Sequence, residues 1–101
     1  MQTSFEKGVA KKTRVLAQSF INNHPELTSV DAELAYCKGI DHLTLVRKVK
    51  GKLYRAGISI DYLTNCIRMT VMNRHGKTVH LSIPNGTSLV AHLKFYNVLA
   101  A

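Results

Sequence analysis

Apolar residues recur at helical spacing in the first half of the chain, and this pattern predicts three helices. The helices are expected over residues 4–22, 29–38 and 42–56. Each begins near a residue that can cap a helix, namely Thr3, Thr28 or Asp41. In the third segment the apolar residues share one face and the cationic residues share the opposite face, so we expect one buried and one charged face.

After Asn65 the apolar period changes from helical to alternating, which predicts a β-hairpin over residues 66–84 with the loop Arg74-His75-Gly76. The matching apolar faces set the cross-strand pairs, which are Ile67 with Ile83, Met69 with Leu81 and Val71 with Val79. A last apolar helix is expected over residues 88–99, either packed on the first helix or paired with its copy in a second subunit. The whole chain, residues 1–101, is therefore expected to form one mainly helical α+β domain.

The charge of the chain is strongly asymmetric. Residues 1–41 carry five basic and five acidic side chains, whereas residues 42–101 carry nine basic side chains against Asp61 alone, which accounts for the net charge of +8. Five of the nine basic side chains fall between residues 47 and 55. Such a cationic block, followed by a hairpin with a basic tip, is typical of a surface that meets phosphate groups.

The order of the expected elements resembles the winged helix-turn-helix family of DNA-binding proteins over about residues 28–84. The resemblance is carried by Leu34-Ala35, by Gly39, by Leu53-x-x-Ala56-Gly57 and by the 66–84 hairpin. It implies that helix-turn-helix 29–57 places helix 42–56 in the major groove of duplex DNA, with the hairpin as a wing. It implies base contacts for Thr44, Arg47 and Lys48, and phosphate contacts for Lys50, Lys52, Arg55, Arg68, Arg74 and Lys77. Gly51, on the cationic face, would let the DNA approach closely.

The sequence does not predict an enzyme. Its six carboxylates are scattered without an acid/base dyad, and its five histidines lack metal-ligand spacing, so we expect no catalytic residue, no metal and no cofactor. Cys37 and Cys66 lie far apart, without a ligand motif, and are expected to be small core residues. The chain contains no apolar stretch long enough to span a bilayer, so we expect a soluble cytoplasmic or nucleoid-associated protein.

These observations favour a small transcriptional or replication regulator that binds duplex DNA, and two alternatives stay open. One is an accessory protein of the phage or plasmid type that inhibits or docks onto a protein partner through its basic face. The other is an RNA-binding or RNA-cleaving protein that is similar to small ribonuclease toxins. In the cleaving version His80, on the outer face of the second hairpin strand, would act as the general base.

Overall fold

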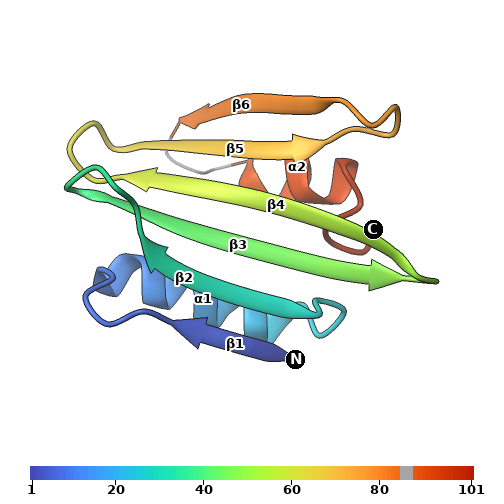
Figure 1. Cartoon of the computed structure of the whole chain (residues 1–101), viewed down its shortest axis with the longest axis horizontal. Coiled ribbons are helices and arrows are strands. Elements are labelled where there is room, and N and C mark those ends of the chain that lie inside the picture. The colour runs from blue at the N-terminus through green and yellow to red at the C-terminus, as the bar shows by residue number, and fades with distance from the viewer. Residues whose placement is uncertain (85–87) are drawn as a thin grey trace.

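The computed structural model describes residues 1–84 and 88–101, and its main feature is a single six-stranded sheet backed by two short helices (Figure 1). The elements in chain order are β1 (Gln2–Phe5), α1 (Lys11–Asn23), β2 (Ser29–Leu34), β3 (Ile40–Val49), β4 (Lys52–Asp61), β5 (Cys66–Met72), β6 (Thr78–Pro84) and α2 (Leu89–Phe95). The strands lie in the order β1-β2-β3-β4-β5-β6; β1 and β2 are parallel, and the other neighbours are antiparallel. Both helices lie on the same side, so the sheet has a covered face and an open face.

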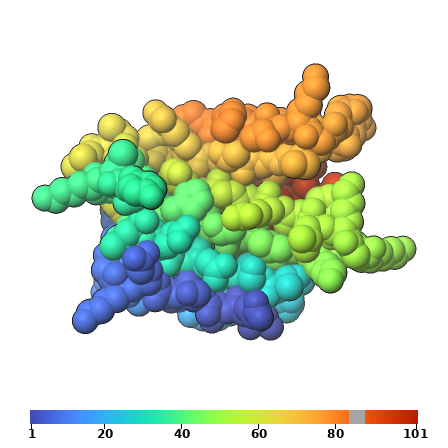
Figure 2. Space-filling model, viewed as in Figure 1, coloured from blue at the N-terminus to red at the C-terminus, as the bar shows by residue number. Residues whose placement is uncertain are grey.

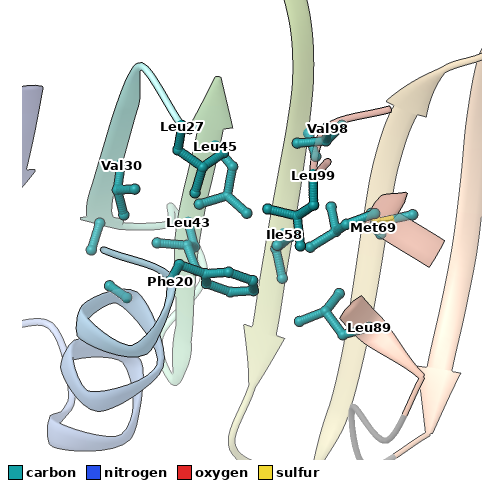
Figure 3. Close-up of a cluster of buried hydrophobic side chains, with 14 of the residues drawn as sticks. Phe20, Leu27, Val30, Leu43, Leu45, Ile58, Met69, Leu89, Val98 and Leu99 are labelled. Carbon is teal, nitrogen blue, oxygen red and sulfur yellow. The ribbon is translucent and has the colours of Figure 1, made fainter. Parts of the chain in front are cut away.

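The hydrophobic core lies between the covered face and the two helices. Leu43, Ile58 and Met69 are adjacent in register on β3, β4 and β5, and each side chain is fully buried. Phe20 of α1 and Leu89 of α2 point toward this row from the helical layer (Figure 3). Burying one face of each strand requires an apolar residue at every second position, which is the pattern that these strands carry.

The prediction of a mainly helical, winged-helix-like fold was wrong. Residues 42–56 form most of a long antiparallel hairpin in which Val49 pairs with Lys52. Its two-residue turn consists of Lys50 and Gly51, with φ angles of 50° and 82°. Two successive residues at positive φ are typical of a type I′ turn, whose twist matches that of the flanking strands. Gly51 therefore serves the turn of a hairpin and does not open the face of a recognition helix.

The two helices predicted before this segment were also wrong in kind or extent. Residues 29–34, within the expected second helix, form the strand β2. Thr28, expected to cap that helix, instead accepts a hydrogen bond at its Oγ1 from the backbone N–H of Lys48 on the neighbouring strand, at 3.0 Å. Residues 4 and 5, expected to start the first helix, belong to β1 instead. The helix begins only at Lys11 and forms the main part of the crossover that a parallel β1–β2 pair requires.

Asp41, predicted to cap a helix over 42–56, caps α1 instead. Its carboxylate is buried and its Oδ2 accepts hydrogen bonds from the Ala10 backbone N–H at 2.9 Å and from Thr13 Oγ1 at 2.7 Å. Thr13 also forms a hydrogen bond with the hydroxyl of Tyr62. A negative charge at this place stabilises the first turn of α1, because the N-terminus of a helix carries a partial positive charge.

The predicted 66–84 hairpin was confirmed, including its register. Ile67 faces Ile83, and the other two apolar pairs align as expected. Gly76 has a φ angle of 78°, in the left-handed region that the predicted loop required. The C-terminal helix α2 ends at Phe95, so it is shorter than the expected 88–99. Two residues further on, Asn97 has a φ angle of 64°, which does not continue a helix. The helix packs on the sheet through the buried Leu89.

Candidate nucleic-acid interface

Most of the positive charge gathers at one end of the sheet. The β3–β4 turn and the β5–β6 loop lie together there, on the right in Figure 1, because β3 and β5 run in the same direction. We call this end, formed by residues 47–55, 72–79 and 94–97, the basic end. It carries every lysine and arginine after Val46 except Arg68, namely Arg47, Lys48, Lys50, Lys52, Arg55, Arg74, Lys77 and Lys94.

Unlike the cations, the carboxylates do not gather at the basic end. Among residues 1–84 and 88–101, every carboxylate except Glu26 lies at the middle of the sheet or toward its other end. Glu26 accepts a hydrogen bond from the Ala100 backbone N–H at 3.0 Å, and its Oε2 lies within hydrogen-bond distance, 3.2 Å, of His24 Nδ1. Burial works to raise the pKa of Glu26, but the hydrogen bonds from Ala100, its own backbone and His24 together hold that pKa below its usual value. The charge of Glu26 is thus engaged with the C-terminal segment.

A groove opens between the two hairpins at the basic end. The pairing of β4 with β5 stops at Ala56 and Val71, whereas β4 continues to Lys52 in partnership with β3. Beyond this point the hairpins separate and leave a space of about 660 Å³, which we call the hairpin groove. Figure 2 shows the hollow between the orange β5–β6 hairpin and the yellow-green β4, with red atoms of the C-terminal segment at its bottom.

The hairpin groove combines cationic and aromatic side chains. Its cationic or basic residues are Lys52, Arg55, Arg74 and His75, and its aromatic residues are Tyr54, Phe95 and Tyr96. Lys52 Nζ lies 5.2 Å from the centre of the Tyr54 ring, and the rings of Phe95 and Tyr96 meet edge to face at 5.0 Å. Among the described residues that line the groove there is no carboxylate. Positive charge and flat aromatic surface are therefore presented side by side.

The β5–β6 wall of the groove ends in a closed loop. Asn73 Oδ1 accepts hydrogen bonds from the backbone N–H groups of His75 and Lys77, at 2.9 Å and 3.0 Å, and the Asn73 N–H donates to the carbonyl of Lys77 at 2.8 Å. These bonds hold Arg74 and Lys77 at the tip, within reach of a ligand at the basic end.

Seven of the residues predicted to contact DNA meet at the basic end with their side chains or turn backbone exposed: Lys48, Lys50, Gly51, Lys52, Arg55, Arg74 and Lys77. Arg47 also lies there, but on the covered face, where its Nη1 donates a hydrogen bond to the carbonyl of Asn97 at 3.0 Å. This bond attaches the segment after α2 to β3. Thr44 lies at mid-sheet on the open face and is 7 % exposed, and Arg68 lies on the open face opposite Ser59. The fold thus separates Thr44 and Arg68 from the cluster.

The aromatic part of the groove was not predicted from the sequence. Tyr54 falls within the cationic run and could have been noticed there, since aromatic residues among basic ones are typical of nucleic-acid-binding surfaces. Phe95 and Tyr96 were interpreted as part of an apolar helix. Phe95 is in fact 78 % exposed, and only the fold brings it next to residues 40 positions earlier.

The alternative general base, His80, lies on the exposed open face of β6 with its Nδ1 3.1 Å from Thr70 Oγ1. The carboxylate in the same cross-strand row is Asp31 of β2, four strand spacings or about 19 Å away. His80 therefore has no acidic partner in that row. In the part of the chain that the structure describes, no group of histidine, cysteine or carboxylate side chains is arranged to hold a metal ion. Cys37 is exposed and Cys66 is half-buried, so the prediction that both are core residues was wrong.

Comparisons with family models, curated proteins and solved structures found no match to this chain. Within residues 1–84 and 88–101, neither helix has the length and apolar character needed to cross a membrane. The basic end and its groove are therefore the features of the molecule that bear on its function.

Proposed function

We propose that this protein binds nucleic acid through its basic end. The observation that carries the proposal is the hairpin groove, in which cations and aromatic rings occur together and from which carboxylates are absent among the described residues. Phosphate groups supply the negative charge that such a surface attracts, and release of their counterions drives association. An acidic protein surface would satisfy the cations but would give no reason for three aromatic rings between them.

The proposal concerns binding and not regulation. A regulatory role was expected from a recognition helix over 42–56, and this segment is a hairpin. A two-stranded ribbon can also enter the major groove of duplex DNA, with side chains such as Lys48 and Lys52 directed at the phosphates. Duplex DNA is therefore one of the ligands to be tested.

Fluorescence-anisotropy titrations over a salt series test the proposal. The wild-type protein should bind labelled oligonucleotides at low salt, with an affinity that falls steeply as salt rises. Lys50→Gln and Lys52→Gln should each weaken binding on every sequence, because each variant neutralises one phosphate fewer. Each should therefore also reduce the log–log salt slope, by about 0.7 for a single strand or about 0.9 for a duplex.

Arg68→Gln is the matched control, because it removes one exposed positive charge from the open face away from the basic end. It should leave the slope nearly unchanged. Equal losses for Arg68→Gln and Lys52→Gln would show that only the net charge matters and would contradict a defined interface. Absence of binding to any nucleic acid at low salt would overturn the proposal and favour the alternative of docking onto a protein.

A further inference from the structure

The form of nucleic acid that fits the hairpin groove follows from its aromatic side chains. Phe95 is 78 % exposed, although the alternating strands and both helices bury or half-bury most other large apolar residues. Its ring meets that of Tyr96 edge to face, and its exposure leaves ring surface accessible to a ligand. A single exposed apolar residue is ordinary on a protein surface, but this one lines a groove that it shares with Tyr54 and the cations Lys52 and Arg74.

The size of the groove agrees with a small planar ligand. At about 660 Å³ it falls within the roughly 300–1,000 Å³ of known ligand sites, and residues of both hairpins line it. The bases of a duplex stack on one another, so an aromatic side chain reaches their faces only after unstacking that costs on the order of a few kcal/mol per step. The bases of a single strand expose their faces at much lower cost.

We infer that the hairpin groove binds single-stranded nucleic acid, with a base stacked on Phe95 and the adjoining phosphates held by Lys52, Arg55 and Arg74. The inference rests on the proposed nucleic-acid binding and specifies its ligand. Stacking is tolerant of sequence because every base has a flat face, so the groove selects strandedness rather than a base sequence. Single-stranded DNA and single-stranded RNA share this chemistry, and the test includes both.

Phe95→Ala removes the stacking ring from a site exposed enough for the fold to tolerate the change. We expect the affinity for oligothymidylate or oligouridylate of about 12 nucleotides to fall roughly 5- to 150-fold, the loss for one stacked base. Affinity for a duplex and the salt slope for the single strand should change little, because the cations remain. Leu63→Ala is the matched control, since Leu63 is 82 % exposed in the loop at the other end of the sheet. It should bind as the wild type does.

A tryptophan variant gives a direct readout of the contact. The chain contains no tryptophan, so Phe95→Trp introduces a single indole that retains the flat stacking surface. Its fluorescence should be quenched when the single strand binds, and its affinity should stay close to that of the wild type. Leu63→Trp, with its indole at the far end, should show no quenching.

The outcomes separate this inference from the proposed function. If Lys52→Gln weakens binding while Phe95→Ala does not and Phe95→Trp is not quenched, the protein binds nucleic acid but the stacking site is refuted. Equal losses on duplex and single strand for Phe95→Ala would refute it as well. If no nucleic acid binds the wild type, the proposed function fails first. A loss confined to DNA or to RNA supports the inference and identifies the sugar that the groove accepts.

Discussion

Replacing Gly51 with alanine should lower the free energy of unfolding, and the magnitude follows from the geometry of the β3–β4 turn. Gly51 has a φ angle of 82°, and a Cβ built there would meet no atom within 4 Å. The cost of the alanine therefore comes from its backbone conformation and not from a clash with neighbouring residues. An L-residue in the left-handed region costs about 1–2 kcal/mol. Alanine also restricts the unfolded chain, which offsets about 0.4–1 kcal/mol. The net destabilisation should be about 0.5–1.5 kcal/mol.

Replacing the neighbouring Lys50 with glycine should have the opposite effect on stability. Lys50 has a φ angle of 50°, so Lys50→Gly relieves the left-handed strain of a non-glycine residue and should stabilise the protein by up to about 1 kcal/mol. Both variants are compared with the wild type by urea denaturation, followed by far-ultraviolet circular dichroism. A change of 1 kcal/mol moves the melting temperature of a domain of this size by about 4–8 °C, so either effect is measurable.

The signs of these two changes test the hairpin itself. In a helix, alanine is more stable than glycine by about 1 kcal/mol, so Gly51→Ala would stabilise and Lys50→Gly would destabilise the protein. In the hairpin both signs are reversed. A stabilising Gly51→Ala together with a destabilising Lys50→Gly would therefore refute the type I′ turn and support a helix over 42–56.

Three further predictions concern stability. Asp41→Asn keeps the shape of the side chain but removes the negative charge of the carboxylate, whose Oδ2 accepts hydrogen bonds from Ala10 and Thr13. The free energy of unfolding should fall by about 1–3 kcal/mol, measured as a lower urea midpoint. An unchanged midpoint would show that the carboxylate does not stabilise α1. Leu43→Ala leaves a cavity in the fully buried core and should cost about 2–5 kcal/mol in the same assay, and a loss below about 1 kcal/mol would contradict the close packing of the sheet against the helices. Burial, opposed by the hydrogen bond to Thr13 and reinforced by the charge of Asp41, raises the pKa of Tyr62 above its usual 10.0. The contribution of neutral Tyr62 is therefore complete below about pH 10 and is lost as the pH rises through the raised pKa. Above about pH 10 the melting temperature should fall more steeply for the wild type than for Tyr62→Phe, and parallel curves in that range would contradict this.

The 66–84 hairpin could be predicted because its information is local. Apolar and polar residues alternate over residues 67–71 and 79–83, and Gly76 occurs at the one place where the loop needs a left-handed residue. Once the loop is placed, the register follows, because a shift of one residue would turn every apolar side chain to the opposite face.

The β3–β4 hairpin was missed because two apolar residues interrupt its alternation. Val46 and Leu53 lie on the open face, where Leu53 is 63 % exposed, and on a helical wheel they fall beside the inward-facing Leu45 and Ala56. The turn added to the error, since Lys50-Gly51 lacks the asparagine or aspartate that usually precedes glycine in a type I′ turn. Packing in the sheet overrides the local helical pattern here, as it also does for β2.

The cations close together in the sequence also lie together in the structure, even though their secondary structure was predicted wrongly. Lys48, Lys50 and Lys52 are so close in the sequence that a helix and a hairpin tip both bring them together. What depends on the fold is the direction of each side chain, and the hairpin turns Arg47 onto the covered face, where it holds Asn97. The ligand preference depends on the fold even more, because Tyr54 and Phe95 become neighbours only when β4 separates from β5 and α2 ends beneath the gap. Charge density along a sequence therefore indicates that a phosphate surface exists, while the choice between duplex and single strand is made by contacts between distant segments.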